Sequence, residues 1–472
     1  MGVLDRIGQL EVSKWSMTVG DSPIVLASAM DRKVFAWLDA NLGKVLRLTP
    51  HARWRTGWDA EVERGGEVVA LYIRGPRGDN YVSPIDMQQE AAIHRAFLAS
   101  GIPAPKVLGL IDDPCSLVLE RIPGTINTAT IDDADDRRQV REEFVEIIAR
   151  LHRLPLESFA DVGLEIPVGA DAVSRGLYAA SEAIFDRLIG RPWPLMRFVA
   201  GWLRRNVPLD RTRAAFINAD AGQFMFEGNS VTGLIDFEMS AFGDPAAELA
   251  GMRLRDTSEP LGDLAALYDH YEQVSGDRIP KRLIEYHTAG YCGVNGFMLW
   301  PLAFTSTPEQ DYTAYLNFAV ATSRWCVTAM AAHDGVQLSE PHTPESRAMG
   351  FDQAGHHLVR QIAAMAGPDP ATAYARDSAA ALANYQQRWL TYGADVLAAD
   401  LADTEALIGS RPSGQADMME RLEAFVLQAG EEYDARLIQH FHKWLRRQDF
   451  LLTGCGIASY NVGLDLQVIP ER

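Results

Sequence analysis

The hydrophobic pattern of this chain changes its period once, and that change restricts the folds open to it. Apart from one short patch at 216–236, runs typical of strands lie within residues 44–121, where one helical stretch, 87–100, interrupts them. From residue 122 onward, apolar residues recur mainly every three or four positions, as in amphipathic helices. Because strands and helices are segregated along the chain, we expect an α+β fold with a small β-rich N-lobe and a mainly helical C-lobe.

Four parts of the chain follow from this pattern. Residues 1–43 form an N-terminal extension with a helix, and residues 44–121 form the N-lobe. Residues 122–335 form the helical C-lobe, and a polar, turn-rich stretch at 334–345 separates it from an appended α-helical region, 336–472. A lid over a site, a homodimer interface and a separate helical module are all open roles for these C-terminal helices.

The charge balance excludes two classes of partner. Forty-four Lys and Arg residues oppose 63 Asp and Glu residues, so a net charge of -19 repels phosphate backbones and anionic lipid. We therefore expect no nucleic-acid partner and no membrane partner.

The most apolar stretch, 315–332, is interrupted by Ser323 and Arg324, and we expect it to be a buried helix. Four scattered cysteines and the lack of an export leader favour a cytoplasmic location.

One segment of the C-lobe carries the chemistry. Gln223–Phe226 and Val231–Ile235 are β-prone runs separated by a turn signal. Folding at that turn brings Gln223 beside Asp236, with Asp220 one short loop away. Mg²⁺ prefers oxygen ligands and keeps much of its water, so one carboxylate and one amide, completed by substrate phosphates, make a suitable site. The separate carboxylate, Asp220, is placed to accept a proton from a hydroxyl nucleophile.

This segment resembles the catalytic segment of the aminoglycoside phosphotransferase and choline kinase family. That family reads H-G-D, a short loop, Asn, a hairpin, then I-D-[FW]-E and G-D-P. The matching residues here are Asn218-Ala219-Asp220, Gln223, Ile235-Asp236-Phe237-Glu238 and Gly243-Asp244-Pro245. The resemblance extends over about residues 25–335. It implies a protein-kinase-like two-lobed fold and an ATP-dependent phosphotransferase that acts on a hydroxyl group of a small molecule.

The resemblance also implies roles in the catalytic loop and at the metal. Asp220, with Asn218 beside it, would orient or deprotonate the acceptor hydroxyl. Gln223 and Asp236 would hold Mg²⁺.

In the N-lobe the resemblance points to a nucleotide site. Arg74, at the end of the strand 67–74, would hold the phosphates of ATP while Glu90 braces it. Arg77 is a second candidate for this role, and a surface salt bridge is the alternative reading of the Arg74–Glu90 pair. The backbone of Glu120 and Ile122 would receive the adenine edge.

The loop 49–57 takes the place of the phosphate-covering loop but is not rich in glycine. Its Arg53 and Arg55 are candidate phosphate contacts, although we favour solvated positions for both.

Three departures from the family pattern bear on activity. The usual His is Asn218, the usual Gly is Ala219, and the loop from Asp220 to the amide is two residues shorter and ends at Gln223 rather than Asn. Ala219 is tolerable only where φ is not positive. The longer Gln side chain can compensate for the tighter loop. The alternative function is therefore a catalytically impaired pseudokinase that binds a nucleotide or a partner.

Other residues have weaker signals. We assign Asp244 to a helix cap before Pro245, and we leave Glu238 between assisting the metal and facing solvent. The aromatic run 286–304 is expected to be core. The adjacent histidines His356 and His357 point in different directions on a helix and are not expected to chelate a metal together.

Overall fold

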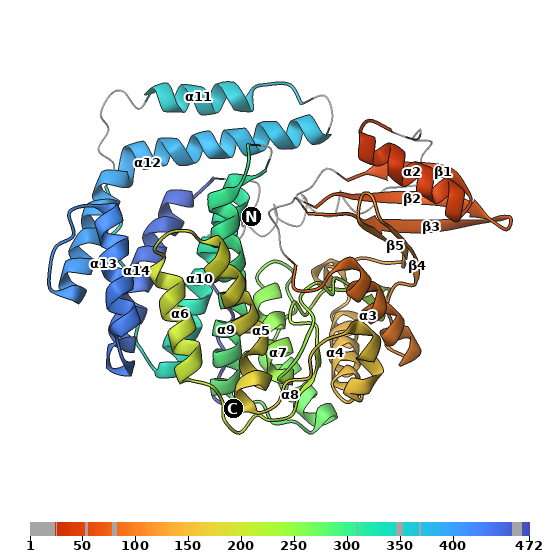
Figure 1. Cartoon of the computed structure of the whole chain (residues 1–472), viewed down its shortest axis with the longest axis horizontal. Coiled ribbons are helices and arrows are strands. Elements are labelled where there is room, and N and C mark those ends of the chain that lie inside the picture. Colours follow the sequence, from red (N-terminus) through yellow and green to blue (C-terminus); the bar gives the residue numbers. More distant parts are fainter. Residues whose placement is uncertain are drawn as a thin grey trace. The chain divides into compact units, whose positions relative to one another are not determined.

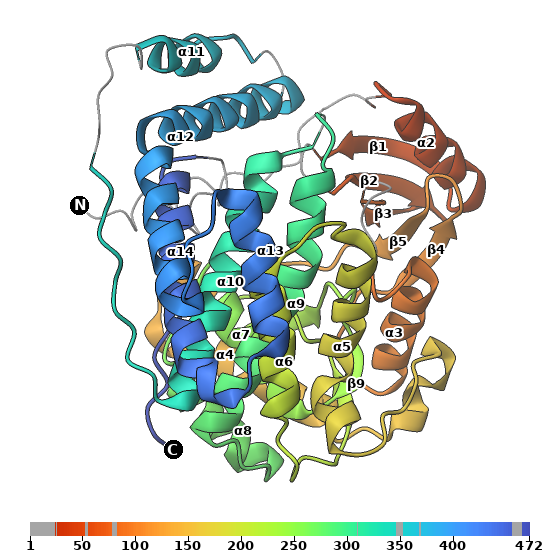
Figure 2. The same cartoon turned by 60° about the vertical axis from the view of Figure 1, so that its left-hand side comes forward.

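A computed structural model describes residues 24, 26–51, 55–77, 83–308, 310–345, 353–367, 370–455 and 465–472. The chain divides into two compact units, and their elements are labelled in Figures 1 and 2. The first unit contains the residues up to 166 together with 215–241 and 259–277. The second contains 167–214, 242–258 and 278–472.

The first unit contains a five-stranded antiparallel sheet in the order β1-β2-β3-β5-β4. Its strands are β1 (Lys44–Pro50), β2 (Gly57–Arg64), β3 (Glu67–Arg74), β4 (Val107–Ile111) and β5 (Ser116–Glu120). The sequence predicts strands at 44–48, 57–62, 67–74, 107–111 and 115–120, and each observed strand agrees with one of these to within two residues. The β2–β3 hairpin turns at Gly65 and Gly66, where positive φ angles favour glycine because it has no Cβ. An unbroken register then places Arg74 opposite Gly57 at the strand end.

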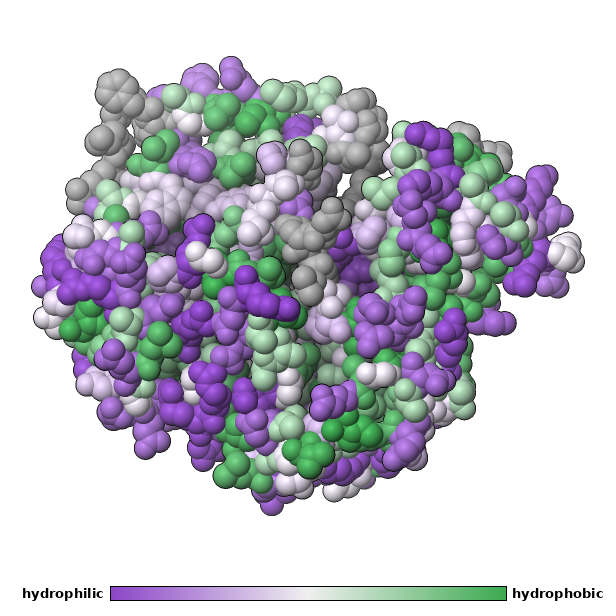
Figure 3. All heavy atoms as spheres, viewed as in Figure 1, coloured by the Kyte–Doolittle hydropathy of each residue, from purple (hydrophilic) through white to green (hydrophobic). Residues whose placement is uncertain are grey.

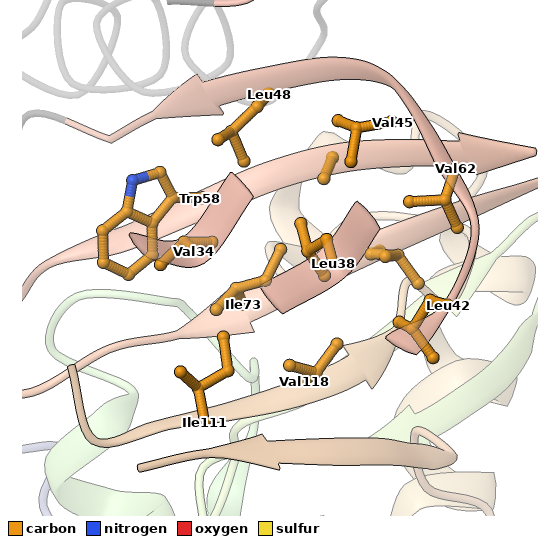
Figure 4. Packing of buried hydrophobic residues seen from close by; sticks show 12 residues of the cluster. Val34, Leu38, Leu42, Val45, Leu48, Trp58, Val62, Ile73, Ile111 and Val118 are labelled. Carbon is orange, nitrogen blue, oxygen red and sulfur yellow. The ribbon is translucent and has the colours of Figure 1, made fainter. Parts of the chain in front are cut away.

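A hydrophobic core joins one face of this sheet to α2 (Ala29–Asn41). Figure 4 shows Val34 and Leu38 of the helix packed against Trp58 and Ile73 of the strands, and all four are fully buried. Apolar residues spaced four apart lie on one face of a helix, which explains this contact.

The helical spacing of apolar residues over 24–42 predicts a helix from Ile24, but α2 begins later, at Ala29, because Ser28 forms a capping box with Asp31. The Asp31 carboxylate also accepts a hydrogen bond of 2.8 Å from the indole of Trp58, so the cap is tied to the core.

Arg74 lies on the other face of the sheet. Successive strand side chains point to opposite faces, so Ile73 enters the core while Tyr72 and Arg74 share the opposite face. Tyr72 there packs against a cluster that includes Ala91 of α3 (Met87–Ala99). The alternation of β3 therefore directs Arg74 toward the helix that carries Glu90.

The remainder of the first unit is built around a second hairpin, β7 (Phe224–Glu227) and β8 (Ser230–Leu234). It also contains β6 (Ala215–Ile217), α4 (Ala134–Leu151), α8 (Leu264–Ser275) and the short 3₁₀ helices η1 (Thr128–Thr130) and η2 (Leu156–Val162). Phe224 stacks on Phe144 of α4 with ring centroids 4.1 Å apart. Gly124 passes so close that a Cβ there would lie 2.0 Å from the Phe226 carbonyl oxygen, which requires glycine.

The second unit is helical. Its helices are α5 (Ala170–Leu188), α6 (Pro194–Arg205), α7 (Pro245–Arg255), α9 (Lys281–Thr305), α10 (Tyr312–Asp334), α11 (Gln353–Ala363), α12 (Pro370–Ile408), α13 (Gln415–Gln428) and α14 (Asp434–Leu452), with a 3₁₀ turn, η3 (Glu431–Tyr433). The short strand β9 (Ala241–Gly243) crosses the boundary between the units. Helices α11 and α12 lie side by side (Figures 1 and 2).

The architecture confirms the predicted α+β fold class, with a small antiparallel sheet and a helical remainder. The expected core role of the aromatic run is also confirmed, because Tyr286 and Trp300 are at most 2% exposed. The sequence also predicts a helix over 346–366; its first seven residues lie outside the described residues, and α11 occupies 353–363.

No helix in the described part of the chain combines the length and the apolar character that a membrane span needs. Helix α10, which contains the most apolar predicted stretch, is buried along most of its length. Hydrophilic residues are spread widely over the face drawn in Figure 3.

Candidate functional site

Asp236 follows strand β8 in an uncommon backbone conformation. Its φ is 63°, and it is the one non-glycine residue with positive φ among the described residues. Such a conformation costs about 1–3 kcal/mol for an L-residue and persists only where surrounding contacts impose it. Ile235, the residue before Asp236, is held opposite Gln223 because its amide donates a hydrogen bond of 3.1 Å to the Gln223 carbonyl. The predicted approach of this hairpin's two ends is present.

Asp220 and Gln223 are joined directly. The Gln223 amide nitrogen donates a hydrogen bond of 2.5 Å to the Asp220 carboxylate. This contact leaves the Gln223 amide oxygen as the group suited to a cation, because the nitrogen is already committed as a donor. Ala219 is fully buried and does not have positive φ, so the replacement of the usual glycine is compatible with this loop.

Asn218 stabilises the loop that carries Asp220 through hydrogen bonds of its side-chain amide. Its side chain is 3% exposed, its amide nitrogen lies 3.5 Å from the Ile235 carbonyl oxygen, and its amide oxygen accepts a hydrogen bond of 3.2 Å from Ser240. These contacts connect the loop of Asp220 to the segments on either side of Asp236. Asn218 therefore has a structural role at the position where the family has His.

Arg74 and Glu90 form a buried ion pair, so the alternative of a surface salt bridge is wrong. The Arg74 Nε lies 3.0 Å from a Glu90 carboxylate oxygen, and the two side chains are 8% and 3% exposed. Arg74 also contacts Asp236 through its terminal nitrogen. Burial by itself would lower the pKa of Arg74, but the charges of Asp236, Glu90 and Glu238 raise it well above its ordinary value. Burial raises the pKa of the Glu90 carboxyl, against the opposing charge of Arg74.

Glu238 does not face solvent. It is 5% exposed and contacts three guanidinium groups: those of Arg55 and Arg77, and that of Arg74 at 3.2 Å. The expectation of a solvated Arg55 is also wrong, since Arg55 is 5% exposed. Arg53 lies outside the described residues. Sequence reasoning missed these pairs because each joins residues more than 150 positions apart.

An aromatic cluster supports the segment between the two acids. Phe237 makes edge-to-face contacts with Phe97 and with the ring of His94, at centroid distances of 4.8 and 4.7 Å. The His94 Nδ1 lies 3.0 Å from the Pro105 carbonyl oxygen. Burial lowers the pKa of His94 to about 3, so this ring is neutral at physiological pH. The cluster anchors Phe237 and thereby directs its two neighbours, Asp236 and Glu238, toward the arginines.

The chain around Glu120 and Ile122 leaves strand β5 with part of its backbone already paired. The Glu120 amide donates to the Lys106 carbonyl at 2.8 Å, and the Arg121 amide donates to the Ala70 carbonyl at 2.9 Å. Hydrogen bonding to an adenine edge through Glu120 would therefore use its carbonyl oxygen.

The donor set suits a hard cation. Gln223 supplies an amide oxygen, and the half-buried Asp236 supplies a carboxylate that is 20% exposed. Over the described ranges, no three His, Cys, Asp or Glu side chains form a group able to hold a metal. Mg²⁺ commonly binds through one or two carboxylates with substrate phosphates and water, so two protein ligands fit it.

Asp244 belongs to the second unit and caps α7 there, accepting a hydrogen bond of 3.0 Å from the Ala246 amide. It also pairs with Arg211 at 2.7 Å and with His287 at 3.3 Å, and His287 contacts the Tyr178 hydroxyl at 2.7 Å. Burial acts to raise the pKa of Asp244, but the hydrogen bonds and charges of His287 and Arg211 lower it well below its ordinary value. The predicted cap is confirmed, and the buried network behind it was not foreseen.

Comparisons with known proteins match this chain to a family of phosphotransferases. A sequence model of the phosphotransferase enzyme family matches residues 29–282, more than half of the chain. Among curated proteins, acyl-CoA dehydrogenase family member 11 of Gallus gallus is 24% identical over 200 residues, which cover 40% of this chain and 25% of that protein. The chain thus matches about a quarter of the length of this relative.

Solved structures with a similar course of the chain include three proteins. A Ralstonia eutropha protein provisionally named as an aminoglycoside phosphotransferase is 14% identical, with a TM-score of 0.49, over 65% of this chain and 98% of that one. Aminoglycoside phosphotransferase APH(4)-Ia, bound to ADP and hygromycin B, is 13% identical, with a TM-score of 0.45, over 63% and 97%. Macrolide 2'-phosphotransferase MphH of Brachybacterium faecium is 17% identical, with a TM-score of 0.43, over 61% and 97%.

Proposed function

Because the chain belongs to the phosphotransferase enzyme family, we propose that it transfers the γ-phosphoryl group of ATP to a hydroxyl group of a small molecule. The observation that carries this proposal is the convergence of a base, a cation site and a buried strand-end arginine in one compact unit. Phosphoryl transfer depends mainly on positioning and on neutralising charge, and those groups are suited to both tasks.

Asp220 is the proposed base. Its hydrogen bond from Gln223 holds one carboxylate oxygen in place, and the carboxylate accepts the proton of the acceptor hydroxyl as that oxygen bonds to the γ-phosphorus. The bond between the γ-phosphorus and its bridging oxygen breaks, and ADP leaves. Asn218 acts by positioning this loop rather than by touching the substrate.

Gln223 and Asp236 are the proposed ligands of Mg²⁺, which neutralises phosphate charge when bound. Arg74 holds the phosphates in bidentate fashion, and Glu90 keeps its guanidinium oriented. Glu120 and Ile122 are the proposed backbone contacts of the adenine ring.

A panel of small molecules that carry a hydroxyl group would identify the acceptor. Aminoglycosides, choline-like alcohols, sugars and hydroxyacyl compounds belong in it. A cytoplasmic location, the four-part division of the chain and a homodimer formed through the C-terminal helices stay proposals beside the main one.

The test is ADP formation from ATP and Mg²⁺ with each acceptor, comparing the wild type with Asp220→Ala. We expect acceptor-dependent ADP formation in the wild type, with phosphorus NMR identifying a new phosphate ester. The Asp220→Ala variant should bind the nucleotide but form the ester far more slowly. A wild type that binds no nucleotide would exclude the proposal.

A pseudokinase is the second candidate, and the Asn218 loop favours it. Asn218 occupies the place of the family's His, and one oxygen of the Asp220 carboxylate already accepts a hydrogen bond from the Gln223 amide nitrogen. Nucleotide binding without turnover on the whole panel, unchanged in Asp220→Ala, would favour this candidate.

A further inference from the structure

Three arginines from two segments of the chain converge beside Asp236. Arg55 precedes β2, Arg74 ends β3, and Arg77 follows β3 by three residues. All three contact Glu238, and Arg74 also contacts Asp236. These guanidinium groups would repel one another without their shared carboxylates.

The cluster is buried, which makes its composition informative. Arg55 and Arg77 have side chains 6% and 11% exposed, and Glu238 is 7% exposed. Burial lowers the pKa of Arg55, and the neighbouring charges of Arg74 and Arg77 act in the same direction. Buried charges are costly unless they are paired. A cluster that served only to stabilise the fold would need fewer than three buried arginines.

The hydrogen-bonding capacity of Arg55 is incompletely used. Its buried Nε has no hydrogen-bond partner within the described part of the chain. A guanidinium group offers five donors in a planar fork that suits carboxylate and phosphate equally well. A polyphosphate carries several anionic oxygens in a row, whereas Glu238 has only two carboxylate oxygens for its three arginine partners. The chemistry that would use all three cations is a di- or triphosphate.

We propose that Arg55 and Arg77 join Arg74 in a three-arginine polyphosphate site, which Asp236 and Glu238 occupy until a polyphosphate displaces their carboxylates. This inference rests on the proposed function for its nucleotide, and it adds two phosphate-binding arginines and a resting state to that site. Asp236, once released from Arg74, is available to the cation. Polyphosphate and cation would therefore each favour the binding of the other.

Calorimetric titration of the full chain tests the first half of the proposal. The probes are Mg²⁺-ADP, Mg²⁺-tripolyphosphate and adenosine, and the variants are Arg55→Ala and Arg77→Ala. We expect each variant to bind both polyphosphates at least about tenfold more weakly, the usual effect of losing a charge-assisted hydrogen bond. Adenosine binding should not change. Wild-type affinity for tripolyphosphate in both variants would overturn the proposal.

Two further variants guard against misfolding. Arg47→Ala removes an arginine of the same sheet that pairs with Glu61 at 2.9 Å, and it should leave all three affinities unchanged. Arg55→Lys keeps the positive charge but loses the planar fork, so it should fold normally and still bind tripolyphosphate more weakly.

Glu238→Gln tests the second half. If Glu238 competes for the arginines, its neutralisation should raise the affinity for metal-free tripolyphosphate by about three- to tenfold, a gain of about 1 kcal/mol. Weaker binding in this variant would show that the carboxylate supports the arginines instead of occupying their site, and would overturn the resting state. Tripolyphosphate contains no nucleoside and is not turned over, so these results stand even if the protein proves to lack kinase activity.

Discussion

Both units of this protein bury ion pairs, and those of the site in the first unit lie on different kinds of element from the Arg447–Asp400 pair of the second unit. In the first unit the arginines and acids of the site lie on strand ends and loops, with Glu90 on a helix. In the second unit, Arg447 of α14 pairs with Asp400 of α12 at 2.6 Å, and both belong to long helices. Side chains on packed helices have fixed neighbours, whereas loops and strand ends can exchange partners. A buried ion pair alone is therefore weak evidence of a binding site, and the element that carries it is more informative.

The largest expected effect is at the proposed base in the first unit, where a substitution should change activity and not stability. Asp220→Ala should lower the rate of phosphoryl transfer by about 10²–10⁴-fold, because it removes the proton acceptor. Its unfolding midpoint should match that of the wild type, since Asp220 is not part of the arginine cluster. Steady-state ADP formation and a urea titration measure the two quantities. A loss of activity that merely follows a loss of stability would assign Asp220 to the fold.

In the second unit the expected effect is on stability. Arg447→Met leaves the buried Asp400 without its cation, and the free energy of unfolding should fall by about 3–5 kcal/mol. Arg446→Met is the matched control, because Arg446 is 31% exposed and pairs with the exposed Glu340, so its loss should cost under about 1 kcal/mol. Affinity for Mg²⁺-ADP should be unchanged in both. Weaker nucleotide binding in Arg447→Met would contradict the contrast between the units.

Asp400 should make the second unit less stable as pH rises. Burial raises its pKa to about 7, against the charge of Arg447, whereas the ordinary value is 3.8. The folded state thus binds the proton more tightly, and stability present below pH 4 is lost as the pH rises through 7. The shift corresponds to an effect on the order of 4 kcal/mol. Hydrogen exchange of the α12 amides should show this slope, and Asp400→Asn should remove it.

His94 should give the first unit the opposite slope. Its pKa is about 3 in the folded protein and 6.5 ordinarily, so the unfolded chain binds a proton first as the pH falls. Stability is then lost from pH 6.5 down toward pH 3, by about 2 kcal/mol at pH 5. His94→Asn retains a donor for the Pro105 carbonyl and should flatten the slope of the α3 amides. Equal slopes in variant and wild type would locate the acid sensitivity elsewhere.

Local sequence signals were sufficient for most elements of the fold. The strands and the hairpin with Gln223 and Asp236 depend on alternation and turn residues within short windows, and the structure has them nearly where they were predicted. The pairing of Arg74 with Glu90 was expected from the resemblance to the family, and the structure has it. Boundaries differed where a cap decided them, as at Ser28 before α2.

The burial and the partners of the charged residues could not be predicted from local sequence signals. Glu238 and Arg55 gave no local sign of burial, because a charged residue near a strand end is usually solvated. The link of Asp244 to His287 and Tyr178 joins three distant segments of the second unit and was equally hidden.

The amino-acid sequence by itself determined the order and kind of the elements and the short hairpin on which the acids Asp220 and Asp236 sit. Those features depend on residues close together in the chain, where backbone preference and side-chain period act directly. Only the tertiary structure decided which cations meet which anions, and how deeply each pair is buried. The strength of a charge interaction depends on distance and on exclusion of water, and both arise when remote segments pack together.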